Sequence, residues 1–193
     1  MPVKSNFAAG NILTASDVNT YLTNGGLVYI TEGTATNSSA VDVNSVFSST
    51  YDNYRIVLQM ASRSTLQYGR FQLRTAGAVT ATNYFSASKW WNMTLANNVF
   101  QDNDTATTAM AGGPSGDQSL NRWAIWTFDL ANPNKAQPTQ MTGAGSGVRR
   151  DDNWYSWVTG GVQYDSTQFT GIRFLPNGGT FDVAYKIYGY RQA

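Results

Sequence analysis

The fold class is decided by residues 54–60, which read Tyr-Arg-Ile-Val-Leu-Gln-Met. Large apolar side chains occupy every second position, and an arginine and a glutamine stand among the residues between them. This period of two is typical of a β-strand that is buried on one face and reaches water on the other. Residues 70–74, Arg-Phe-Gln-Leu-Arg, repeat the alternation. The sequence therefore predicts half-buried antiparallel strands.

Further strands and the turns between them are expected along the rest of the chain. The later strand-like runs lie at 123–130, 154–158, 171–175 and 181–191. Clusters rich in glycine, proline and asparagine predict turns or loops at 75–77, 112–116, 132–134, 143–147 and 176–179. The last run places Lys186, Tyr188 and Tyr190 on its outer face. With about eight to ten short strands, we predict a mainly β protein, an antiparallel β-sandwich with jelly-roll-like connectivity.

One short helix is predicted near the N-terminus, over about residues 15–23. Thr14 can cap its first turn, and Asp17 can bond back to the cap amide. A helix of this length is unstable alone, so its apolar face must dock on something. The apolar residues expected to serve assembly are Phe7, Leu13, Val18, Tyr21 and Leu22. We therefore expect an attachment segment at 1–26 and a β-sandwich domain at 27–193.

The charge and the missing residue types exclude several functions. The 193 residues include 13 Lys and Arg against 12 Asp and Glu, a formal net charge of +1, with no Cys and no His. A Ser-His-Asp triad, a thiolate zinc site and a disulfide are therefore impossible. A near-neutral chain also lacks the attraction on which nucleic-acid binding depends. We expect no enzyme, no cofactor or metal, no nucleic-acid partner, no signal peptide and no membrane insertion; a loose calcium site at Asp102, Asp104 or Asp151–Asp152 is the alternative.

The polar residues indicate a surface that other subunits cover in part. Ser, Thr and Asn together make up 55 of the 193 residues. Uncharged polar groups cost less to remove from water than ionic groups do. The chain also has more aromatic side chains than one small sandwich can bury. Together these two features predict a homotrimer with closed symmetry.

Two aromatic clusters are candidates for ligand binding: Trp90-Trp91 and Trp154-Tyr155-Ser156-Trp157. Successive side chains of a strand face opposite sides, so at least one ring of each cluster points away from a given core. A second sheet, a neighbouring subunit or a sugar can cover such a ring. A sugar presents an apolar C–H face and a rim of hydroxyls, which suit an exposed ring beside polar groups. The predicted ligand-binding set is Trp90, Trp91, Asn92, Arg149, Asp151, Trp154, Tyr155 and Trp157.

Two segments of the chain resemble bacteriophage virion proteins. Residues 7–19 read Phe-Ala-Ala-Gly-Asn-Ile-Leu-Thr-Ala-Ser-Asp-Val-Asn and resemble a segment common in phage tail-fibre and minor structural proteins. Residues 169–191, which close on Ile-Tyr-Gly-Tyr-Arg, are similar to the last hairpin of the β-sandwich domains of such proteins. The segments cover about a fifth of the chain. The resemblance implies a virion appendage, often trimeric, whose N-terminal segment attaches it and whose β domain is exposed.

The function expected from this resemblance is attachment to the host. A tail-fibre or receptor-binding component would bind host cell-surface polysaccharide, contact other virion proteins through its N-terminal segment and reside in the virion. The alternative is a capsid or neck decoration protein that stabilises the virion and recognises no host molecule. A polysaccharide depolymerase is disfavoured, because neither a suitable carboxylate pair nor a repeated β-helix pattern is visible.

Overall fold

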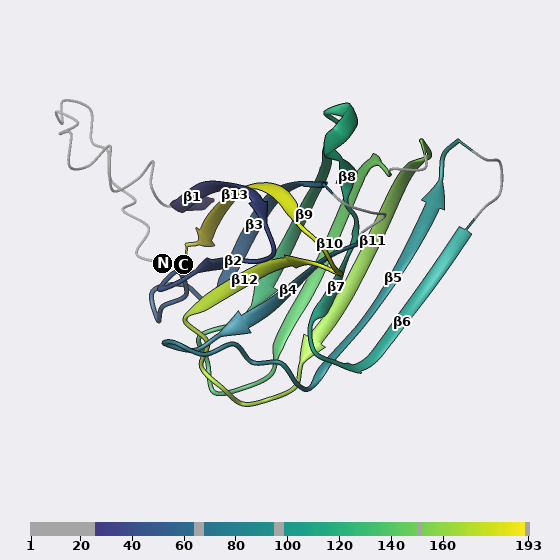
Figure 1. Cartoon of the computed structure of the whole chain (residues 1–193). Coiled ribbons are helices and arrows are strands. Elements are labelled where there is room, and N and C mark those ends of the chain that lie inside the picture. Colours follow the sequence, from purple (N-terminus) through teal and green to yellow (C-terminus); the bar gives the residue numbers. More distant parts are fainter. Residues whose placement is uncertain (1–25, 64–67, 95–98, 150–151, 192–193) are drawn as a thin grey trace, which may run out of the picture.

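The structure, a computed structural model, describes residues 26–63, 68–94, 99–149 and 152–191. Two sheets pack face to face, and the smaller one lies against one side of the larger one (Figure 1). The prediction of a mainly β protein built as an antiparallel sandwich is confirmed. The predicted helix at about 15–23 and the five assembly residues lie outside the described residues.

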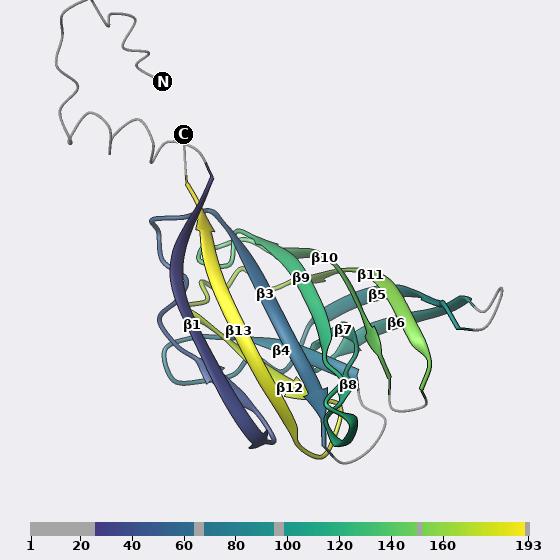
Figure 2. The ribbon, with the colours of Figure 1, turned by 90° about the horizontal axis from the view of Figure 1, so that it is seen from above.

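The larger sheet forms the broad layer of the sandwich, and Figure 2 shows its strands side by side. Their order is β1 (Leu27–Ser38), β13 (Phe181–Tyr190), β3 (Asn53–Ser62), β9 (Ala124–Ala131), β10 (Thr139–Val148), β11 (Trp154–Gln163), β5 (Tyr84–Asn92) and β6 (Val99–Thr107). The short β8 (Gly116–Asp117) adds a parallel pairing to β3, and a 3-10 turn follows at Gln118–Leu120. The smaller sheet has the order β2 (Val41–Val43), β12 (Gly171–Pro176), β4 (Tyr68–Arg74) and β7 (Met110–Pro114).

The strand pairing is nested from the ends of the described chain inward. β1 pairs with β13, β2 with β12, and β5 with β6. Rolling up a long antiparallel hairpin produces such nesting, which agrees with the jelly-roll-like connectivity expected. β9, β10 and β11 form a meander that is inserted between β3 and β5 and widens the larger sheet.

The core lies between the two sheets and follows the alternation seen in the sequence. The four apolar residues at the even positions of 54–60 are each 1% exposed or less. They face β4 and β12 of the smaller sheet, whose inward side chains are also fully buried. Across the core, the Phe71 ring stacks on the Phe128 ring with 4.8 Å between centroids. The period of two therefore located the core residues of β3 and β4 correctly.

The loop predicted at 143–147 is wrong, because these residues lie within β10. Their glycines lie against neighbouring strands and rings rather than in a turn. A Cβ on Gly145 would overlap the Trp157 indole, and one on Gly143 would lie 2.6 Å from the Cβ of Phe128. Neither glycine has a positive φ. The close approach of aromatic rings, not turn conformation, therefore requires them.

The turn predicted at 112–116 also belongs mostly to strands, β7 and β8. Gly112 lies against the Trp126 ring, so it has a packing role as well. The described residues hold thirteen strands, more than the eight to ten expected. The turns predicted at 75–77 and 132–134 are confirmed, as is the turn that follows Pro176.

Candidate functional site

The candidate site is the side of the larger sheet that faces away from the smaller sheet, which we call the outer face. Strand register places its residues in rows across neighbouring strands. On the central strands β9, β10 and β11 the outer face presents Ile125, Thr127, Asp129, Gln140, Thr142, Ala144, Ser146, Trp154, Ser156, Val158, Gly160 and Val162. Asp129 is the one ionisable residue among them. This central part of the face carries little charge, so a ligand or partner can cover it at low desolvation cost.

One part of the outer face carries two exposed indoles. The exposed fraction is 37% for Trp91 of β5 and 56% for Trp154 of β11. Trp91 pairs with Ser156, two residues beyond Trp154, so the two rings are on the same face of adjacent strands. The Lys89 ammonium lies 5.8 Å from the centre of the Trp91 ring, and Val158, 47% exposed, extends the apolar surface. We call Trp91 and Trp154 the tryptophan end.

Four residues of the predicted ligand-binding set face the opposite way, into the sandwich. Trp90, Tyr155 and Trp157 are 7%, 2% and 1% exposed, and Asn92 is 7% exposed. Alternation along β5 and β11 explains this, because residues next to an outward tryptophan must point inward. The expectation that each aromatic cluster sends rings to both sides is confirmed. These four side chains belong to the interior, so Trp91 and Trp154 are the aromatic residues of the set that a surface ligand can reach.

Arg149 joins the inward group rather than the tryptophan end. Its guanidinium lies 5.2 Å from the centre of the Tyr155 ring and 5.9 Å from that of Tyr68. It also donates a hydrogen bond of 3.1 Å to the Tyr68 hydroxyl. Asp151 lies outside the described residues, and its neighbour Asp152 forms an ion pair with Arg122.

A groove of about 600 Å³ hollows another part of the outer face, over β3, β9, β10 and β13. Its polar lining comes from Asn53, Asp129, Gln140, Thr142, Tyr190 and Arg191. On the same face, the Tyr188 ring meets the Tyr29 ring edge to face, with 6.1 Å between centroids. We call this region, with Arg55, Asp129, Tyr188 and Tyr190, the tyrosine end.

A hydrogen-bonded cluster fixes the side chains of the tyrosine end. Arg55 donates from Nε and Nη2 to the two carboxylate oxygens of Asp129, at 2.9 and 2.8 Å. The Tyr190 hydroxyl donates to the same carboxylate at 2.8 Å, and the Arg55 guanidinium lies 5.5 Å from the centre of the Tyr190 ring. The three residues come from three adjacent strands, β3, β9 and β13. A bidentate pair held by a third group presents its remaining polar atoms in a fixed geometry.

The charges of this cluster are stable near neutral pH. Hydrogen bonding from Arg55 holds the pKa of Asp129 below its ordinary value, the Tyr190 hydroxyl acts in the same direction, and burial partly opposes them. The Asp129 carboxylate in turn raises the pKa of Arg55. The chain has no His, the side chain that most often titrates between about pH 5 and 8. Binding at this cluster should therefore change little over that range.

Asp129→Asn gives a test of this electrostatic coupling. Because the folded pKa of Asp129 is lowered, its contribution to stability is complete above the ordinary value of 3.8 and is lost as pH falls through the lower folded value. We expect the variant to be less stable than the wild type at about pH 7 and to approach it at about pH 2. Urea unfolding at both pH values measures this. An equal deficit at the two pH values would contradict the coupling.

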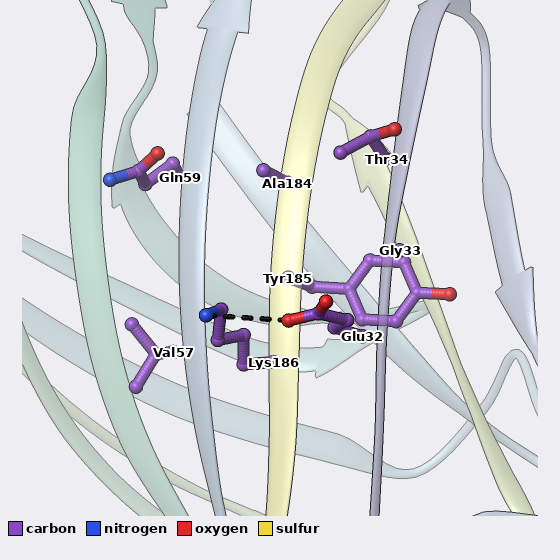
Figure 3. Close-up of a pocket in the computed structure, with 8 residues that line it drawn as sticks. All are labelled: Glu32, Gly33, Thr34, Val57, Gln59, Ala184, Tyr185 and Lys186. Carbon is purple, nitrogen blue, oxygen red and sulfur yellow. Dashed lines mark ion pairs between the residues drawn. The ribbon is translucent and has the colours of Figure 1, made fainter.

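A second groove, of about 590 Å³, lies on the outer face over β1, β13 and β3. Figure 3 shows Lys186 of β13 beside Glu32 of β1, with Val57 and Gln59 on the neighbouring strand. The Lys186 Nζ and the nearest Glu32 oxygen are 3.3 Å apart, and both side chains are more than half exposed. The groove thus combines an apolar floor at Val57 and Ala184 with a paired charge at its margin.

The Arg55–Asp129 pair could not be predicted from the sequence, although the alternation placed Tyr188 and Tyr190 on an outer face. The two residues are 74 positions apart, and only the register of β3 against β9 puts them opposite each other. The available signal was weak: each is a charged residue at an outward position of a strand-like run.

The described ranges hold neither a cluster of metal ligands nor a membrane-spanning helix. Within them, no three His, Cys, Asp or Glu side chains gather closely enough to hold a metal ion. The side chains of Asp102 and Asp104, part of the calcium alternative, lie outside those described. No helix among the described residues has the length and apolar character needed to cross a membrane.

Comparison with known proteins adds one weak structural likeness. The sequence matches no family model and no curated protein. Among solved structures, the chain is similar to a galectin of Caenorhabditis elegans, LEC-6. The two share 11% identity over 86% of this chain and 100% of the galectin, with a TM-score of 0.33.

Proposed function

We propose that this chain is a receptor-binding component of a bacteriophage virion, such as part of a tail fibre, and that it attaches the particle to host glycans without enzymatic activity. The observation that carries the glycan proposal is the tryptophan end, where Trp91 and Trp154 stand exposed beside the small, uncharged outward residues of β10. The resemblance of residues 7–19 and 169–191 to phage virion proteins supports the proposal that the chain is part of a bacteriophage virion.

The proposed mechanism is multivalent binding, in which several weak contacts to sugars together give a high overall affinity. An exposed indole covers the C–H face of a sugar, and nearby hydroxyl and amide groups bond to its rim. Three copies in a homotrimer would engage one cell surface together, so the overall affinity exceeds that of one contact. Residues 1–26 would join the protein to other virion proteins.

A second candidate function is decoration of the capsid or neck. The same outer face supports it, because exposed aromatic residues on an uncharged surface are also typical of protein interfaces. Under this alternative the face would be covered by another virion protein rather than by a host glycan.

Trp154→Ala tests the proposed function. We expect about a 30-fold loss of affinity for host polysaccharide, the equivalent of about 2 kcal/mol for an aromatic residue central to a contact. The melting temperature should change little, because the indole is 56% exposed. Adsorption to host cells and thermal unfolding are measured on the same purified protein.

Leu120→Ala is the matched control for this experiment. Leu120 is 51% exposed, but it lies on the 3-10 turn rather than on the outer face. It should retain full adsorption. If folded Trp91→Ala and Trp154→Ala proteins both adsorb normally, the proposed glycan contact is wrong. If the wild type joins the particle but never binds cells, decoration is the function.

A further inference from the structure

We infer that the outer face binds an extended, uncharged polysaccharide chain at two places, the tryptophan end and the tyrosine end, rather than one terminal sugar. This inference rests on the proposed glycan binding and adds the class of glycan and its path. The two ends lie on the same face of the larger sheet but are built from different residues. The side chains of both ends lie outside the core between the two sheets.

The two ends are too far apart for a single sugar ring to touch both. Trp91 lies on β5 and Tyr190 on β13, five strand steps apart in the sheet. At about 4.8 Å per step, the separation across the sheet is about 24 Å. A ligand that contacts both ends must therefore contain several linked sugars.

The surface between the two ends offers a flat path for such a chain. Its central residues include Thr142, Ala144 and Ser146 of β10, all exposed. Beside them on β11 the outward positions are Ser156, Val158 and Gly160, none with a side chain larger than that of valine. No bulky group on these two strands interrupts the path, and their hydroxyls can bond to sugar hydroxyls along it.

The charges of the face favour a neutral polymer. Arg55 is neutralised by Asp129 through two hydrogen bonds, and Lys186 by Glu32. At the tryptophan end, the Lys89 ammonium lies over the Trp91 ring, and Arg191 adds a positive charge to the lining of the tyrosine-end groove. The charges of the face are thus scattered rather than gathered into a basic patch. Binding of a strongly anionic chain would bring its charges next to the Asp129 carboxylate. The paired groups instead offer donors and acceptors of fixed orientation, which suits uncharged hydroxyls.

A series of polysaccharide fragments of increasing length tests the inference. The probe is the neutral surface polysaccharide of the host, as single repeating units and as long chains. We expect the wild type to bind long chains at least about tenfold more tightly than single units, because two contacts on one chain raise the effective concentration of the second. Binding of the long chain should vary little with salt concentration, since few charges are neutralised.

Two variants test the middle of the path and one of its ends separately. Ala144→Arg places a long side chain in the middle of the face, and it should reduce long-chain affinity to that of single units while leaving single-unit binding unchanged. Gln140→Ala removes an exposed amide from the tyrosine-end groove and should weaken binding of long chains. Leu120→Arg, off the outer face, is the matched control, and melting temperatures confirm that each variant folds.

The outcomes distinguish this inference from the function on which it rests. Equal affinity for single units and long chains, or unchanged long-chain binding by Ala144→Arg, would overturn the two-place inference and leave glycan binding intact. Tighter binding of an anionic surface polysaccharide than of the neutral one, with a steep salt dependence, would identify an anionic polymer instead. If Ala144→Arg converts an assembled wild type into monomers, the face is a contact between copies. Failure to bind fragments of any length would overturn the proposed function itself.

Discussion

Replacing Trp157 with alanine is expected to lower the free energy of unfolding by about 3 to 5 kcal/mol, the range found when a large core aromatic is removed. The Trp157 side chain is 1% exposed and meets the Trp126 ring edge to face, with 6.2 Å between centroids. Gly113 and Gly145 lie against its indole and have no side chains that could fill the space. Urea unfolding of the purified protein measures the loss.

Trp154→Ala is the control, because Trp154 is on the same strand with the opposite orientation. Its indole is 56% exposed, so its removal should change stability by no more than about 0.5 kcal/mol. The pair of variants thus separates packing from surface exposure within one strand. Similar losses for the two would show that the orientation of β11 is wrong.

Asp182→Ala is expected to lower the free energy of unfolding by about 2 to 3 kcal/mol, because it removes charge-assisted hydrogen bonds from a buried carboxylate. Asp182 of β13 is 2% exposed. It accepts a hydrogen bond of 2.7 Å from Arg63 Nη2 and one of 2.8 Å from the Asn37 backbone amide. Arg63 holds the pKa of this carboxyl below its ordinary value. Equilibrium unfolding near neutral pH measures the effect.

Glu32→Gln is the control for this ion pair. It removes the Glu32–Lys186 pair, which links β13 to β1 and is more than half exposed on both sides, whereas Asp182 of β13 is paired with Arg63, just after β3. Exposed pairs contribute no more than about 1 kcal/mol. A loss for Glu32→Gln as large as that for Asp182→Ala would mean that burial does not decide the strength of these pairs.

The alternation of apolar residues was enough to predict the sandwich and several of its strands. It located β3, β4, β9, β12 and β13, because each has one buried face and therefore a clear period of two. It failed at β10 and β7, where glycines occupy the inward positions. A glycine in the sequence looks the same whether it forms a turn or makes room for an aromatic ring within a strand. Only the position of the ring in the folded structure distinguishes the two roles.

The candidate site was predicted in part for a related reason. Alternation established that Trp90 and Trp91 face opposite sides, but not which of them is outside. That choice depends on which face the smaller sheet covers, a property of the tertiary structure. The tyrosine end depends further on strand register, which brings Arg55, Asp129 and Tyr190 together from three distant parts of the chain. Local sequence carries no information on register between strands so far apart.

The pairing of β1 with β13 brings the two ends of the described chain together. Leu27 is opposite Tyr190, and the Arg191 amide donates a hydrogen bond of 3.3 Å to the Gly26 carbonyl. Any polypeptide attached before β1 and any attached after β13 therefore leaves the sandwich from one corner. Domains with adjacent ends can be inserted into a loop of another protein without being pulled apart. The sandwich thus meets the geometric requirement for insertion into another protein as a single module, with the tryptophan end several strands away from the point of attachment.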